Sequence, residues 1–105
     1  MVRETLGSTE YVVLVVLERV LRDAYGATLQ ARIKESTGKY ISLGALYTTL
    51  DRLERKGFVT SRWGEATAER GGRRKRYYRI EGSGVEAVRR MDDLVTSLLP
   101  QSSPT

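Results

Sequence analysis

The residues of this sequence best suited to chemistry form one basic run, RGGRRKRYYR, at positions 70–79. Six cations within ten residues repel one another unless an anion is present. Arginine and lysine side chains neutralise phosphates, and such contacts supply most of the non-specific affinity of proteins for nucleic acids. The run therefore predicts a phosphate-binding segment, whose cations are Arg70, Arg73, Arg74, Lys75, Arg76 and Arg79.

Other kinds of chemistry lack the residues they need. The sequence contains neither cysteine nor histidine, which removes disulfides, thiolate nucleophiles, imidazole bases and most transition-metal ligands. It also lacks glycine-rich phosphate loops of the GxxxxGKS/T or GxGxxG type. We therefore expect no enzymatic activity, no cofactor and no metal site.

Positive charge is concentrated in one part of the chain. Residues 40–80 carry ten Lys/Arg against four Asp/Glu, and the remainder carries eight against nine, so the middle is +6 and the flanks are −1. A basic patch confined to one stretch is typical of a protein that binds a polyanion. The longest apolar run, residues 11–17, is far too short for a membrane span, and the first residues lack the regions of a signal peptide. We expect one cytoplasmic domain.

Hydrophobic periodicity predicts three helices before residue 57. The first, over residues 9–24 with Ser8 as its N-cap, is apolar on almost every face of its first half and needs cover on two sides. The second spans residues 27–36 and ends before Gly38. The third follows Ser42, a favourable N-cap, and ends before Gly57. Its apolar stripe consists of Leu43, Leu46, Tyr47, Leu50 and Leu53.

The period then changes from 3.6 to 2, which predicts strands over residues 58–63 and 74–80 joined by a mobile polar tip at 64–72. Alternation turns Tyr78 and Ile80 inward and Lys75, Tyr77 and Arg79 outward. Trp63 is interpreted as a brace between the hairpin and the third helix, in preference to a stacking platform for a base or drug. Ser83 and Glu86 form a capping box for a final helix that ends near Leu99.

This order of elements predicts a mainly α fold with a small β-hairpin (α+β), a winged helix-turn-helix with an added C-terminal dimerisation helix. The expected divisions are a DNA-binding domain over residues 1–82, the dimerisation helix over 83–99 and a disordered tail over 100–105. In such a layout the third helix enters the major groove and the hairpin, or wing, lies along the backbone. Predicted DNA contacts are Gly44, Ala45, Thr48, Thr49, Arg52, Arg70, Arg73, Arg74, Lys75 and Arg76.

The apolar pattern of the final helix predicts that it packs against another protein chain. Its apolar residues recur at a 3-4-3 spacing in a wide stripe, and a helix that follows a wing projects away from the helical unit. We expect a homodimer paired through this helix and the first helix, with a palindromic DNA site. The predicted interface residues are Val13, Val16, Val88, Met91, Val95 and Leu98.

The segments LGSTEYVVL, AYG, SLGALYTTLDRLERKGFV and RGGRRKRYYRI resemble, in order and spacing over about residues 6–90, the PadR family of bacterial transcriptional regulators. The single helix after the wing is similar to the compact subgroup of that family. The resemblance implies dimeric repressors, often of efflux or detoxification genes, relieved in some members by an aromatic or drug-like ligand. It also implies DNA contacts from the basic wing and from Ser42, Gly44, Ala45, Tyr47 and Thr48.

Three positions depart from the family pattern. Ala27 follows AYG where the family often has an aromatic residue, and Glu81 stands where a threonine usually caps the last helix. Some compact members carry a tryptophan on the last helix that lines a drug pore between subunits, and this sequence has none there.

Two other classes of function fit the same residues. A basic RNA-associated protein would use the wing on a folded RNA, without dimer symmetry. A protein-interaction module would instead direct its arginine-rich wing at an acidic surface of a partner. A stable dimer with a palindromic preference favours the DNA regulator over both.

Overall fold

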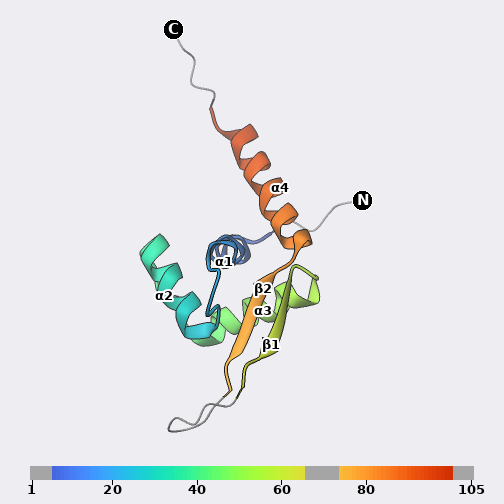
Figure 1. The fold of residues 1–105 in the computed structure, drawn as a ribbon. Helices are drawn as coiled ribbons and strands as arrows, with labels where there is room; N and C mark the ends of the chain where they lie inside the picture. Colours follow the sequence, from blue (N-terminus) through green and yellow to red (C-terminus); the bar gives the residue numbers. More distant parts are fainter. Residues whose placement is uncertain (1–5, 66–73, 101–105) are drawn as a thin grey trace.

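Three helices, a two-stranded hairpin and a fourth helix follow one another along the chain (Figure 1). The computed structural model describes residues 6–65 and 74–100. The hairpin and the last helix extend in opposite directions from the packed helices (Figure 1). This is the predicted α+β winged-helix arrangement. Its elements are α1 (Ser8–Arg19), α2 (Gly26–Thr37), α3 (Leu43–Arg55), β1 (Val59–Trp63), β2 (Arg76–Ile80) and α4 (Gly82–Leu98).

The core is built around α1, which contacts α2, α3, α4 and β2. Its run of apolar residues supplies Val13, Leu14, Val16 and Leu17, all of them buried. A helix that is apolar nearly all round must be covered on more than one side. Three leucines of α3, at positions 46, 50 and 53, are fully buried against this core.

The first helix ends earlier than its periodicity indicates. It stops at Arg19, and Val20 is already extended, whereas the sequence predicts a helix to residue 24. The next residues pair with the hairpin instead, since the Tyr78 amide donates to the Ala24 carbonyl at 2.8 Å and Tyr25 bridges to Tyr77. Leu21, which the prediction places within the helix, is 89% exposed.

The start of α1 also differs from the prediction. Gly7 is its N-cap, and Ser8 is the first helical residue. Glu10 makes the capping contact, because its Oε1 accepts from the Gly7 amide at 2.8 Å. Its Oε2 accepts from Lys56 Nζ at 2.9 Å. The buried Glu10 carboxylate thus joins the start of α1 to the end of α3.

The predicted boundaries of α2 and α3 are confirmed. Gly38 follows α2 in the left-handed conformation, with φ of 73°, and Gly57 follows α3 with φ of 80°, a conformation that favours glycine. The Ser42 hydroxyl caps α3 by accepting from the Ala45 amide at 3.1 Å. Between the two helices, Gln30 Nε2 donates to the Ile41 carbonyl at 2.8 Å.

The hairpin is antiparallel and pairs Val59 with Ile80, Ser61 with Tyr78 and Trp63 with Arg76. The strands are slightly shorter than predicted, and most of the predicted tip, residues 66–72, lies outside the described residues. Tyr78 is buried, as its inward position predicts. No helix within residues 6–65 and 74–100 is long and apolar enough to cross a membrane.

The last helix begins against the base of the wing. An added Cβ on Gly84 would lie 2.4 Å from the carbonyl oxygen of Phe58, the residue before β1, so α4 approaches the backbone there more closely than any larger residue permits. The predicted capping box of Ser83 and Glu86 is wrong. Glu81 is the N-cap, and the close approach lets the Ser83 hydroxyl donate to the Gly57 carbonyl at 2.6 Å.

The buried pair of Glu10 and Lys56 makes stability depend on pH. Burial raises the pKa of Glu10, but hydrogen bonds from Lys56 and the Gly7 amide, with the charges of Lys56 and Arg52, outweigh burial and hold this pKa below 4.5. A carboxyl whose pKa is lower in the folded state contributes stability that is present above its unfolded pKa and lost as the pH falls through its folded pKa.

We therefore expect Glu10→Gln to lower the free energy of unfolding at pH 7 by about 1–3 kcal/mol, because it leaves Lys56 without its anion. The difference between the variant and the unmodified protein should narrow as the pH falls below about 4.5, near the reference pKa of a glutamate. Urea unfolding at pH 7, 5 and 3 measures both effects, with Glu86→Gln on the exposed surface of α4 as the control. A difference that is constant with pH would contradict the assignment.

Candidate nucleic-acid interface

The outer face of α3 is an open surface of small side chains. Ser42, Gly44, Ala45 and Thr48 are exposed, and a Cβ added at Gly44 would have no atom within 4 Å. A helix with such a face can approach a flat or grooved partner closely, and threonine offers both a methyl and a hydroxyl group to base edges. Four of the predicted contact residues thus lie together.

Thr49 does not belong to this face, although it was predicted there. It is 6% exposed, and its hydroxyl donates to the Ala45 carbonyl at 2.9 Å within the same helix. The helical period places it between Leu46 and Leu53, on the inward side. A back-bonded hydroxyl needs no partner from outside the helix.

Tyr47 and Arg52 flank the outer face. The Tyr47 ring lies so close to Gly26 that a Cβ there would be 2.2 Å from its hydroxyl, so this side chain spans from α3 to the first residue of α2. It is 40% exposed, which matches its expected position at the edge of the core. Arg52 is exposed, and its charge also acts on Glu10.

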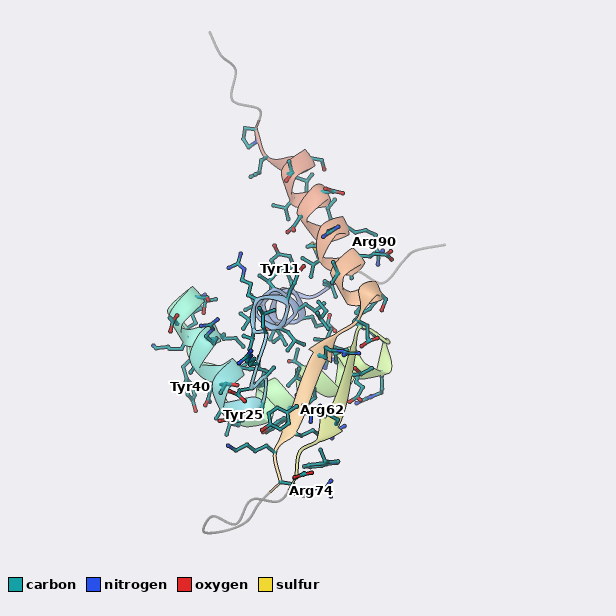
Figure 2. The ribbon with its side chains drawn as sticks, in the orientation of Figure 1. Tyr11, Tyr25, Tyr40, Arg62, Arg74 and Arg90 are labelled. Carbon is teal, nitrogen blue, oxygen red and sulfur yellow. The ribbon has the colours of Figure 1, made fainter. Side chains whose placement is uncertain are left out.

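The wing presents cations beside aromatic rings. Arg74 Nε donates to the Gly64 carbonyl at 2.9 Å, and its guanidinium lies 5.9 Å from the centre of the Trp63 ring. Lys75 Nζ lies 4.4 Å from the centre of the Tyr25 ring. Figure 2 shows Tyr25, Arg62 and Arg74 at the wing end of the molecule. Two further predicted contacts, Arg70 and Arg73, lie outside the described residues.

Arg76 is held by other residues of the protein. Its Nη2 lies 3.1 Å from Glu54 Oε1, and its Nε donates to the Ser61 hydroxyl at 3.0 Å. That hydroxyl donates in turn to Glu54 Oε2 at 2.8 Å. No local sequence pattern marks Glu54 or Ser61, because their link to Arg76 depends on the hairpin register and on the packing of the hairpin against α3.

A groove of about 410 Å³ separates α3 from the wing. Trp63 lines it and is 55% exposed, and its interpretation as a brace between the wing and α3 stays a prediction. Tyr78 forms the buried wall, and burial raises the pKa of its phenol. The groove combines aromatic rings with cations, and its lining comprises Tyr25, Tyr47, Asp51, Trp63, Arg74, Lys75, Arg76 and Tyr78.

A model of the PadR-like transcriptional regulator family matches residues 13–90. The chain belongs to this family. Its members are transcriptional regulators rather than enzymes, and the outer face of α3 and the basic wing fit a regulator that binds DNA. A search of curated proteins finds no match.

Solved structures of PadR-like proteins share the fold. One is a PadR-like transcription factor from Bacteroides fragilis, with a TM-score of 0.73 and 23% identity over 86% of this chain and 82% of that one. A PadR family regulator from Clostridium difficile has a TM-score of 0.69 and 21% identity, covering 88% and 91%. A regulator from Eggerthella lenta has a TM-score of 0.66 and 27% identity, covering 86% and 76%.

In this PadR-like regulator, α4 carries an apolar stripe that residues 6–65 and 74–100 leave uncovered. Leu94 and Val95 are about half exposed, at 46% and 47%, and Leu98 is 75% exposed. A groove of about 500 Å³ runs beside the stripe, between α4 and the start of α1, lined by Leu6, Tyr11 and Met91 among others. The Tyr11 hydroxyl donates to Asp92 across this groove.

Three of the predicted interface residues are not on the surface. Val13, Val16 and Val88 are at most 5% exposed, because α1 is covered by the other elements of its own chain and Val88 packs against that core. The prediction is corrected for these three. The predicted residues that remain accessible are Met91, Val95 and Leu98.

Proposed function

We propose that this PadR-like regulator is a homodimeric repressor that binds a palindromic operator. The proposal is supported by two surfaces of the same chain. The outer face of α3 lies beside the cationic wing, and α4, with its exposed apolar stripe, extends in the opposite direction from the wing (Figure 1). In such an arrangement α3 reads base edges and the wing contacts the adjacent phosphates.

The proposed DNA contacts on α3 are Ser42, Gly44, Ala45, Tyr47, Thr48 and Arg52, and those on the wing include Arg74 and Lys75. All are on the surface of the described chain or line the groove between α3 and the wing. Arg70 and Arg73 stay predictions from the sequence. Residues 1–82 form the proposed DNA-binding unit, and residues 83–99 form the helix that pairs two copies.

Dimerisation is supported by the exposed stripe of α4. An apolar stripe on a projecting helix is unfavourable in water, and pairing with a second copy covers it. A two-fold dimer sets two recognition helices roughly 34 Å apart, one helical turn of DNA, which requires a palindromic site. Repression, and its relief by an aromatic or drug-like ligand, are what the family resemblance implies. We also propose the cytoplasm as the site of action, since a bacterial-type regulator meets its DNA there.

The function is tested by fluorescence anisotropy at physiological salt, where non-specific attraction is weak. The duplex upstream of the protein's own coding sequence is compared with a shuffled duplex and a structured RNA. We expect a preference of about 10³ or more for the upstream duplex. Equal binding to the three would contradict operator recognition, and a preference for the RNA by a monomer would favour the RNA-associated alternative.

The two adjacent threonines of α3 test which face reads the bases. Thr48→Val removes an exposed hydroxyl and keeps the shape of the side chain, so we expect it to change the ranking of operator variants, by about 1–3 kcal/mol at one base pair. Thr49→Val makes the same change at a buried position and should leave the ranking unaltered. Binding to a panel of single-base operator variants measures both. Equal effects from the two substitutions would remove the outer face of α3 from recognition.

The stripe on α4 is tested with Val95→Asp. A carboxylate forced into the proposed interface loses its hydration without gaining a partner, which costs several kcal/mol, so the variant should sediment as a monomer. Arg89→Asp, exposed on the opposite face of α4, is the control and should remain dimeric. If Val95→Asp sediments as an intact dimer, this stripe is not the interface.

A further inference from the structure

Glu54, Ser61 and Arg76 form a closed ring of hydrogen bonds, which we call the wing clamp. The carboxylate of Glu54 accepts from Ser61 at 2.8 Å and from Arg76 at 3.1 Å, and Arg76 donates to Ser61 at 3.0 Å. The residues come from α3, β1 and β2, so each bond joins a different pair of elements. Three bonds between three elements fix the hairpin against α3.

The wing clamp also reaches Trp63. The guanidinium carbon of Arg76 lies 5.5 Å from the centre of the Trp63 ring and 5.6 Å from that of Tyr78. Tyr78 is buried and Trp63 is 55% exposed, so Arg76 connects the core to the ring that lines the groove. A planar guanidinium can stack on rings while its edge donates hydrogen bonds, and both arrangements restrict its motion.

The charge of Arg76 is already compensated. Glu54 lies within ion-pair distance, and the Arg76 side chain is 34% exposed. Arg74, by contrast, is exposed, and among the residues that the structure describes no carboxylate pairs with it. A phosphate near Arg76 would have to compete with Glu54, whereas one near Arg74 would not.

From these contacts we propose that Arg76 is a positioning residue of the wing and not one of its phosphate ligands. Through Glu54 and Ser61 it holds the hairpin at a fixed angle to α3 before DNA arrives, so that the contacts of Arg74 and Lys75 form without further ordering. This inference rests on the proposed DNA-binding function and corrects the prediction that Arg76 binds phosphate directly.

The test separates position from charge with a double variant, Glu54→Ala/Arg76→Ala, which removes the wing clamp without changing the net charge. The matched control is Glu86→Ala/Arg89→Ala, which removes one charge of each sign from the exposed surface of α4, outside the wing. Arg74→Ala serves as the reference for loss of a phosphate contact. Circular dichroism verifies that each variant is folded.

Binding to the upstream duplex is measured over a range of salt concentrations. The slope of log K against log salt is negative, and Arg74→Ala should make it less steep by about 0.9, the value for one phosphate. The double variant should bind about tenfold more weakly, because its wing must be ordered on binding. Its slope should be unchanged, because the same phosphates are contacted. If the slope of the double variant is less steep by about 0.9, or if its affinity is unchanged, the proposal is overturned.

A second readout needs no DNA. Trp63 is the one tryptophan of the chain, so time-resolved fluorescence anisotropy reports on the wing alone. In the free protein the double variant should gain a fast local motion of this ring that the control pair lacks, and DNA should suppress it. Identical decays in the double variant and the unmodified protein would overturn the proposal. If no duplex binds, the proposed function fails, yet this measurement still decides whether the wing clamp holds Trp63.

Ser61→Ala gives a milder form of the same test if the double variant does not fold. It removes the hydroxyl that bridges Glu54 and Arg76 and leaves both charges in place. We expect an affinity loss of about two- to fivefold with an unchanged salt slope, since the two hydrogen bonds of the hydroxyl are lost while the direct bond between Arg76 and Glu54 remains. An unaltered affinity together with an unaltered Trp63 decay would count against positioning.

Discussion

The burial of α1 is the constraint on which the rest of the structure depends. Its apolar residues leave hardly any face for water, so α2, α3, α4 and β2 all pack against it. Among the described residues of this helix, Glu10 is the one acidic side chain that is largely buried. It accepts hydrogen bonds from the Lys56 ammonium and the Gly7 amide, and these bonds offset the cost of its desolvation. Because most apolar residues of α1 are covered by its own chain, the continuous apolar stripe left for a partner is on α4.

The distribution of charge divides the proposed DNA-binding surface into two parts. The outer face of α3 offers small side chains, and the wing offers the cations. Within the wing, the cations differ in their surroundings: Arg76 is neutralised by Glu54, whereas Arg74 is open to solvent. A count of basic residues therefore overstates the charge available for phosphates, and the position of each guanidinium decides what it contributes.

Local sequence signals predicted the elements whose ends are determined locally. Ser42 before α3 and Gly38 and Gly57 after the helices carry their own backbone preferences, and the leucine stripe of α3 fixes its inward side. Two failures are local, because Glu10 sets the start of α1 through Gly7 and Thr49 bonds to Ala45 within its own helix. Others involve partners distant in sequence. Ala24 and Tyr25 pair with the hairpin instead of continuing the helical pattern, and Ser83 bonds to Gly57 instead of capping α4. The link of Arg76 to Glu54 and Ser61 likewise depends on strand register, which no local pattern contains.

The close approach at Gly84 makes α4 a rigid extension of the DNA-binding unit. Its first turn packs on the Phe58 carbonyl, and Ser83 bonds to Gly57, the residue that follows α3 and its C-cap. In the proposed dimer, the angle at which two copies of α4 cross would therefore set the separation and tilt of the two copies of α3.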